Sequence, residues 1–322
     1  MDVRRLGRTG LKVSALCLGT MTFGNQADEE SAFAIMDKAY DAGVFFFDSA
    51  DVYPVMPRPE TWGRSEEIAG NWIRSRGLRE RIVLATKGRG KVGPGPNDAG
   101  LSRKHLLDAI DASLRRLQTD YVDLYQVHSF DPETPLDETL RALDDIVRSG
   151  RARYIGCSNF AAWQLAKALW ISDRQGLVRF DSVQPRYNLL DRRIEDELLP
   201  LCLDQGVGVT PYSPIAGGLL TGKYGAGRQP DANARYILFG RQAQITPQAL
   251  AAIDGLTALA REHGATLAQF AVAWVAAQPA VSAPIVGATR PEQLDETLRA
   301  ADLKLDEATL RRATEIAREA GA

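Results

Sequence analysis

The feature that most constrains the fold is a regular alternation between short apolar segments and longer segments with helical periodicity. The apolar segments lack polar–apolar alternation, which is typical of strands buried on both faces. They lie at residues 15–18, 44–47, 82–85, 122–127, 152–155, 182–184, 207–210 and 282–286. This order predicts an α/β fold with a parallel sheet, either a (β/α)8 barrel or a doubly wound sheet.

The intervening segments carry their apolar residues on one helical stripe. They are residues 29–42, 65–74, 102–117, 135–148, 161–175, 193–205, 247–263, 267–278 and 291–300. Asp28, Ser102 and Thr246 stand where N-cap residues belong, and Gly43 and Gly206 stand where helices should end. These signals support separate helices between the strands.

A single (β/α)8 barrel domain over residues 1–322 is the favoured architecture, because no linker or change of composition divides the chain. Residues 3–6 and 11–14 predict an N-terminal β-hairpin that closes the bottom of the barrel. Two long connections, 51–64 and 211–245, are expected to be functional loops at the opposite, C-terminal mouth.

Composition excludes several classes of function. The chain has 39 Lys and Arg against 41 Asp and Glu, a net charge of −2, so neither nucleic acid nor an anionic membrane is an expected partner. The N-terminus lacks an apolar leader, and three cysteines suit a reducing compartment, so we expect a cytoplasmic protein. Three histidines without metal-ligand spacing predict no metal site. The oligomeric state is left open.

Two glycine-rich motifs resemble nucleotide-binding loops without their context. Residues 88–93 match G-x-G-x-x-G, but Pro94 follows where a dinucleotide fold needs a helix. Residues 217–223 match G-x-x-x-x-G-K, but Tyr224 replaces the Ser or Thr of a P-loop. We interpret the first as a loop. The second remains a candidate for contact with some other phosphate.

Polar residues follow three of the predicted strands. Asp48, Lys87 and His128 come at the carboxyl ends of these strands, and Tyr53 lies five residues after Asp48. A barrel brings such positions together at its mouth. An ammonium lowers the pKa of a neighbouring phenol, a carboxylate balances the ammonium, and a neutral imidazole can orient a carbonyl. The set predicts a proton donor for carbonyl reduction, with hydride supplied by a cofactor.

The motifs around these residues resemble those of aldo-keto reductases, and the long loop 53–70, with Pro59-Glu60-Thr61, resembles that of the bacterial stand-alone branch. The resemblance rests on residues 43–53, 84–87, 123–128 and 156–160, and it extends from the hairpin to the helix after Pro291. It implies a catalytic tetrad of Asp48, Tyr53, Lys87 and His128. It also implies an NADPH-dependent carbonyl reductase, reversible as an alcohol dehydrogenase, that acts on a small aldehyde or ketone.

The resemblance further implies how NADP(H) binds without a dinucleotide fold. The implied contacts are Thr20, Met21 and Asp48 near the reaction centre, Ser158, Asn159 and Gln184 on the nicotinamide amide, Tyr212 stacked on its ring, Ser213, Pro214, Ile215, Gly217, Gly218, Leu219, Lys223 and Arg235 around the pyrophosphate, and Gly287, Thr289, Arg290 and Gln293 at the adenosine ribose and its 2′-phosphate. Thr297 stands where family members commonly have an adenine-binding Asn. Ser158 and Asn159 have an alternative interpretation as caps of the following helix.

The expected substrate pocket is aromatic. It is predicted to be lined by Phe23, Tyr53, Trp62, His128 and Phe130, with Phe239 as a further candidate. The loop from Tyr212 to Ile245 is expected to fold over the cofactor as a clasp. Two other functions stay open as alternatives: an NADP(H)-binding regulatory protein with little turnover, and a metal-dependent hydrolase on the same barrel.

Overall fold

Eight parallel strands form one curved sheet in this computed structural model, which describes residues 1–223 and 245–319. In spatial order the strands are β10 (Ile285–Val286), β3 (Cys17–Gly19), β4 (Phe46–Asp48), β5 (Val83–Gly88), β6 (Val122–Val127), β7 (Ala152–Ser158), β8 (Phe180–Gln184) and β9 (Gly208–Val209). Isolated bridges between Val209 and Val281 and between Tyr212 and Ile285 join the two ends of the sheet. The predicted (β/α)8 barrel is therefore confirmed.

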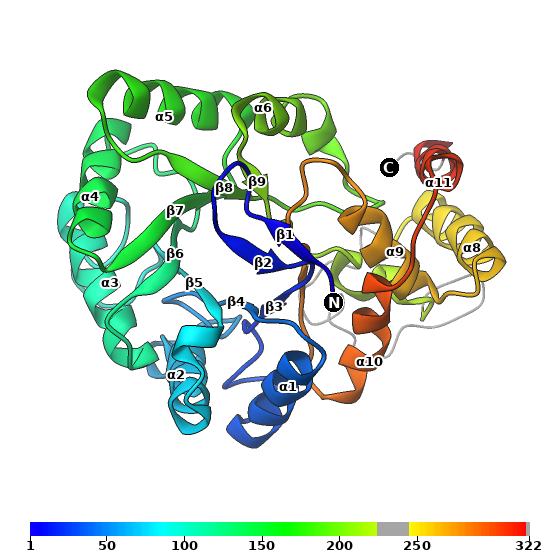
Figure 1. Ribbon diagram of the computed structural model, residues 1–322, viewed down its shortest axis with the longest axis horizontal. Coiled ribbons are helices and arrows are strands. Elements are labelled where there is room, and N and C mark those ends of the chain that lie inside the picture. Colours follow the sequence, from blue (N-terminus) through cyan, green and yellow to red (C-terminus); the bar gives the residue numbers. More distant parts are fainter. Residues whose placement is uncertain (224–244, 320–322) are drawn as a thin grey trace.

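Helices surround the sheet (Figure 1). They are α1 (Glu29–Asp41), α2 (Arg64–Arg76), α3 (Arg103–Leu117), α4 (Leu136–Arg148), α5 (Ala162–Gln175), α6 (Leu198–Gln205), α8 (Pro247–Glu262), α9 (Leu267–Ala276), α10 (Glu292–Leu298) and α11 (Glu307–Glu319). The predicted caps form, since side-chain oxygens of Asp28, Ser102 and Thr246 accept bonds from backbone N–H groups of α1, α3 and α8.

Buried side chains on successive strand residues enter two different cores. In β4, Phe46 belongs to a small cluster inside the barrel, whereas Phe47 packs outward against Trp72 of α2 with ring centroids 5.3 Å apart. In β5, Val83 likewise faces the inner cluster and Leu84 the outer one. Both faces are apolar, which explains why these strands show no polar alternation.

The N-terminal hairpin, β1 (Val3–Arg5) and β2 (Lys12–Ser14), closes the barrel as predicted. Leu6 joins the inner cluster. Gly7, at φ +56°, lies so close to the start of β9 that a Cβ would come within 2.5 Å of Gly206 O and Gly208 N. Only glycine permits this approach, which fixes the hairpin against the bottom of the sheet.

The helices differ from the prediction in two places. The segment 193–205 is split into a 3₁₀ turn, η3 (Arg193–Glu195), and α6. The split occurs where Glu195 accepts a bond from Tyr187 Oη at 2.7 Å and forms an ion pair with Arg192. Helix α11 was not predicted. Its signal was present, since Asp306 Oδ1 accepts a bond from Thr309 N at 2.8 Å at the start of an amphipathic segment.

Candidate active site

The four residues proposed from the sequence come together at the mouth of the barrel, where the strands have their carboxyl ends. Asp48 is the last residue of β4, His128 follows β6, and Tyr53 lies in the loop after β4. Lys87 lies within β5, because that strand extends to Gly88 and not only to the predicted residue 85. We call Asp48, Tyr53, Lys87 and His128 the Lys87 cluster.

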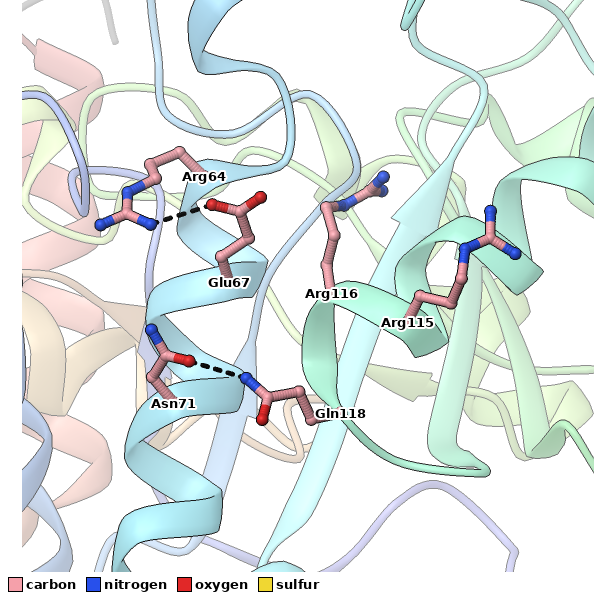
Figure 2. Close-up of a pocket in the computed structure, with 6 residues that line it drawn as sticks. All are labelled: Arg64, Glu67, Asn71, Arg115, Arg116 and Gln118. Atoms are coloured by element: carbon pink, nitrogen blue, oxygen red, sulfur yellow. Dashed lines mark hydrogen bonds and ion pairs between the residues drawn. The ribbon is translucent and has the colours of Figure 1, made fainter.

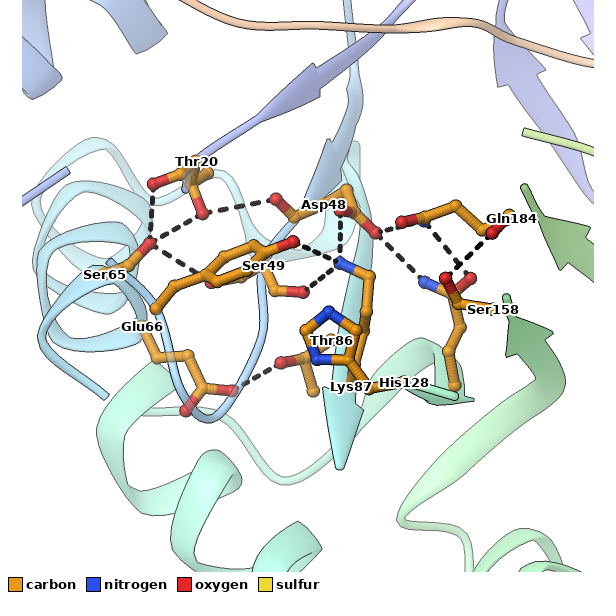
Figure 3. Close-up of polar contacts among 12 residues, drawn as sticks. Thr20, Asp48, Ser49, Ser65, Glu66, Thr86, Lys87, His128, Ser158 and Gln184 are labelled. Atoms are coloured by element: carbon orange, nitrogen blue, oxygen red, sulfur yellow. Dashed lines mark hydrogen bonds and ion pairs between the residues drawn. The ribbon is translucent and has the colours of Figure 1, made fainter. Parts of the chain in front are cut away.

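A buried ion pair forms the base of the cluster (Figure 3). Lys87 Nζ lies 2.5 Å from Asp48 Oδ2 and donates a second bond to Ser49 O at 2.8 Å. The Lys87 side chain is 0% exposed. Burial alone lowers the pKa of Lys87, but Asp48 and Tyr53 outweigh it and raise that pKa to about 12. Lys87 is therefore a fixed ammonium.

The other oxygen of Asp48 is held by two amides. Gln126 Nε2 and Gln184 Nε2 donate to Asp48 Oδ1 at 3.0 and 2.9 Å. The role of Gln126 was missed from the sequence, although its place one residue before the end of β6 was a signal. With both oxygens bonded, the carboxylate cannot rotate away from Lys87.

Tyr53 contacts both Lys87 and His128. Lys87 Nζ lies 3.3 Å from Tyr53 Oη, and the rings of Tyr53 and His128 meet edge to face at 5.7 Å. Burial raises the pKa of Tyr53 above its ordinary value, and the Lys87 charge only partly opposes this rise. The net direction is opposite to the lowering expected from the ammonium alone, so the resting state is a protonated phenol.

His128 is a neutral imidazole, as expected. Burial lowers its pKa to about 3, with further contributions from the charges of Lys87 and Arg89. Its backbone N–H donates to Gly88 O at 3.0 Å, which ties the end of β6 to the end of β5. An uncharged ring beside Tyr53 can donate an N–H to a carbonyl oxygen without repelling Lys87.

A second set of buried carboxyl groups lies behind the Lys87 cluster, and the sequence analysis did not find it. Glu66 accepts a bond from Thr86 Oγ1 and pairs with Arg116 Nη2 at 2.7 Å. Asp51 is 1% exposed, and neither of its side-chain oxygens has a hydrogen bond of normal geometry. Burial, reinforced by the charge of Glu66, raises the pKa of Asp51 to about 8.

The residues expected to hold the nicotinamide are neighbours at the ends of β7 and β8 and in the segment after β9. Ser158 Oγ donates to Gln184 O at 2.8 Å, Asn159 Nδ2 donates to His128 O at 3.0 Å, and Tyr212 Oη donates to Asn159 Oδ1 at 2.9 Å. The alternative that Ser158 and Asn159 only cap α5 is wrong, because its N-cap is Ala161.

The turn after β9 has an unusual backbone. Four of its residues have φ between +51° and +106°: Ser213, Ala216, Gly217 and Gly218. Pro214 and Leu219 are buried, Ile215 is partly buried, and Lys223 is exposed. Arg235, Phe239 and most of the predicted clasp lie outside the described residues. Such left-handed turns make concave surfaces that suit anions.

The turn after β10 is held by hydrogen bonds between its own residues. Gln293 Oε1 accepts bonds from Thr289 N at 2.7 Å and Thr289 Oγ1 at 3.1 Å. Gly287 and Arg290 are exposed. Thr297 is buried, and its hydroxyl donates back to Leu294 O at 3.4 Å, so it is directed to its own helix.

The residues expected near the reaction centre and in the substrate pocket differ in how deeply they are buried. Thr20 N donates to Asp48 O at 2.9 Å, and Met21 is partly buried in the adjoining loop. Trp62 and Phe130 are partly buried, and Phe130 packs edge to face on Phe160 and Trp163. Phe23 is 0% exposed within the outer core, so we leave it out of the proposed pocket.

A surface cavity of about 370 Å³ lies elsewhere, between α2 and α3 (Figure 2). Two of its arginines are already neutralised, Arg64 by Glu67 at 2.9 Å and Arg116 by Glu66. Gln118 Nε2 bonds Asn71 Oδ1 across it at 2.7 Å. It contains none of the residues predicted to be functional.

Within residues 1–223 and 245–319, no group of three or more His, Cys, Asp or Glu side chains could hold a metal ion. No helix in the same part of the chain is long and apolar enough to cross a membrane.

Comparison with known proteins agrees with the geometry. The family model described as "Aldo/keto reductase family" matches residues 15–318. The chain belongs to the aldo/keto reductase family. It is 41% identical to an uncharacterized oxidoreductase, YrpG, from Bacillus subtilis over 98% of this chain and 96% of that protein. It is 43% identical to a probable voltage-gated potassium channel subunit beta from Arabidopsis thaliana, covering 94% and 92% of the two chains. It is 36% identical to versiconal hemiacetal acetate reductase from Aspergillus parasiticus, covering 95% and 94%.

Proposed function

We propose that this aldo/keto reductase is an NADPH-dependent carbonyl reductase that converts a small aldehyde or ketone to an alcohol, and that it can run in reverse as an alcohol dehydrogenase. The observation that carries the proposal is the position of Lys87 Nζ. It bonds the Asp48 carboxylate and the Tyr53 hydroxyl at the same time. This is the arrangement needed to stabilise a phenol oxygen as it gives up a proton.

Each residue of the cluster has a distinct role in the proposed reaction. Tyr53 holds the proton at Oη and donates it to the carbonyl oxygen. Lys87 stabilises the phenolate that remains, and Asp48 keeps Lys87 charged and oriented. His128 donates an N–H that orients the carbonyl. Trp62 and Phe130 provide apolar surface around the substrate.

Members of this family generally bind NAD(P)H, and the residues on the β7–β10 side of the mouth fit such a cofactor. When bound, the reduced nicotinamide supplies the hydride, which no side chain can provide. Ser158, Asn159 and Gln184 would hold its amide and Tyr212 would stack on the ring. The turn at 213–219 would face the pyrophosphate, with Lys223 nearby, because its left-handed backbone suits an anion.

The decisive test replaces the proton donor. Tyr53→Phe keeps the ring and removes the acid, so turnover of an unactivated aldehyde should fall about 100-fold or more while NADPH binding persists. Tyr40→Phe is the matched control, because Tyr40 lies in α1 and packs on Trp72 of α2, away from the mouth. Near-normal kcat in Tyr53→Phe would refute the assignment.

A regulatory function that binds NADP(H) with little turnover is a second candidate, favoured by the identity to a potassium channel beta subunit. NADPH fluorescence separates the two. A shift on binding, followed by oxidation when para-nitrobenzaldehyde is added, supports the reductase. A shift without oxidation over a panel of aldehydes supports the regulatory protein.

A further inference from the structure

Arg89 is held at the mouth by the glycine motif that did not fit a dinucleotide loop. A Cβ on Gly88 would come within 2.1 Å of Tyr125 Oη, and a Cβ on Gly90 within 1.9 Å of Val52 Cγ1. Both glycines are therefore required by close packing. They fix the backbone on either side of Arg89, two residues beyond Lys87.

The backbone of Arg89 is strained. Its φ is +135°, a region that residues with a side chain rarely adopt, and its carbonyl is held by Gly100 N at 2.9 Å. Most other non-glycine residues with positive φ in the described chain also lie in loops after strands, at Met56, Asn159, Ser213 and Ala216. Backbone strain of this kind costs about 1–3 kcal/mol and is concentrated at functional sites.

The guanidinium of Arg89 has no ion pair and no hydrogen bond with the described residues, and its Nε is buried without an acceptor. Its charge reaches His128 and Asp131, where it helps to lower both pKa values. Asp131 does not need it, because that carboxylate already accepts bonds from Leu101 N, Thr134 Oγ1 and Glu133 N at 2.8, 2.8 and 3.1 Å. The backbone N–H of His128 donates to Gly88 O at 3.0 Å, and Gly88 directly precedes Arg89. A cation with unused donors thus follows the residue that is bonded to His128, the residue proposed to orient the carbonyl.

We propose that Arg89 binds a carboxylate on the substrate, so that the preferred substrates are aldehydes that carry a carboxylate. The inference rests on the proposed reductase function and names its substrate class. A planar guanidinium offers two parallel N–H donors that match the two oxygens of a carboxylate. Binding would also satisfy the buried Nε, which otherwise costs free energy.

Two aldehydes of similar shape test the proposal. Wild type should have a higher kcat/KM for para-carboxybenzaldehyde than for para-formylbenzamide, which is neutral. In Arg89→Met the ratio of the two kcat/KM values should fall about 10-fold or more, because a charge-assisted pair is lost. Arg89→Lys should retain part of the preference for the carboxylated aldehyde, because a lysine keeps the positive charge but lacks the planar pair of donors.

Lys91→Met is the control, since Lys91 is an exposed cation in the same loop. Its ratio should match that of wild type. A ratio in Arg89→Met equal to that in Lys91→Met would overturn the proposal, as would a wild type that does not favour the carboxylated aldehyde.

A binding measurement separates failure of this site from failure of the reductase function. Terephthalate carries carboxylates but no carbonyl to reduce, so its calorimetric Kd for the protein with NADP⁺ does not depend on turnover. Binding that is at least 10-fold weaker in Arg89→Met than in Lys91→Met supports the carboxylate site even if no aldehyde is reduced. Equal binding by the two variants contradicts it.

Discussion

At the ends of β4 and β5 the barrel mouth is held together by a buried ion pair, whereas after β9 and β10 it is built from backbone turns. Lys87 is fully buried and bonded to three oxygens. In the turns at 213–223 and 287–293, which we call the rim turns, Lys223, Gly287 and Arg290 are exposed. The groups proposed to move a proton are therefore fixed by the fold alone, while the groups proposed to bind phosphate are left accessible to a ligand.

The largest effect should come from breaking the buried ion pair. Lys87→Met leaves Asp48 charged and unpaired, which should lower the free energy of unfolding by about 3–5 kcal/mol and abolish measurable turnover. Adding Asp48→Asn removes the buried charge, so the double variant should regain stability but not activity. Urea unfolding and NADPH oxidation measure the two effects. Recovery of activity in the double variant would contradict a catalytic role for Lys87.

Asp51 gives a large effect that depends on pH. Its pKa is about 8 in the folded protein and about 3.9 in an unfolded chain. Neutral Asp51 contributes its full amount to the free energy of unfolding below pH about 4. This contribution is lost as pH rises toward 8, and the total loss is about 1.4 kcal/mol per unit of difference between the folded and unfolded pKa. Asp51→Asn does not titrate, so its stability relative to wild type should rise by several kcal/mol over that range.

Urea unfolding at pH 5 and pH 8.5 checks the Asp51 prediction. Asp28→Asn is the control, because its bond to Ser31 N holds the pKa of Asp28 below its ordinary value and keeps it ionised at both pH values. An advantage of Asp51→Asn that stays the same at the two pH values would show that Asp51 is charged when folded.

On the rim turns, the strongest effect is expected for Arg290. If it contacts the 2′-phosphate, Arg290→Ala should weaken NADPH binding by about 10- to 150-fold and leave NADH binding nearly unchanged. Fluorescence titration with both cofactors measures this, and Arg299→Ala serves as a second exposed arginine for comparison. Equal losses for the two cofactors would place the specificity elsewhere.

Gly218 should give the smallest effect. A Cβ there meets no atom within 4 Å, so the obstacle is only its φ of +106°. Gly218→Ala should shift the turn and weaken NADPH binding a few-fold, since the strain is on the order of 1 kcal/mol. Gly10→Ala, equally open but without positive φ, should have no effect. A Gly218→Ala variant with the same Kd as Gly10→Ala would argue against the turn as a phosphate site.

The sequence predicted the barrel and the Lys87 cluster because both depend on local signals. Eight apolar segments are visible along the chain, and the polar residues Asp48, Lys87 and His128 follow three of them. Gln126 and Glu66 were not found because each acts on a residue far away in the sequence, Gln126 on Asp48 and Glu66 on Arg116. The raised pKa of Tyr53 was missed for the same reason, since burial is a property of the whole fold.

Arg116 connects the outer surface to the Lys87 cluster. Its guanidinium lines the cavity between α2 and α3, yet it holds Glu66, which bonds Thr86, the residue before Lys87 in β5. Anyone who redesigns this outer face for solubility or immobilisation would regard Arg116 as a replaceable surface residue. Replacing it would strip the counter-ion from Glu66, a fully buried carboxylate that bonds the neighbour of the proposed catalytic lysine, so Arg116 belongs among the positions to leave untouched.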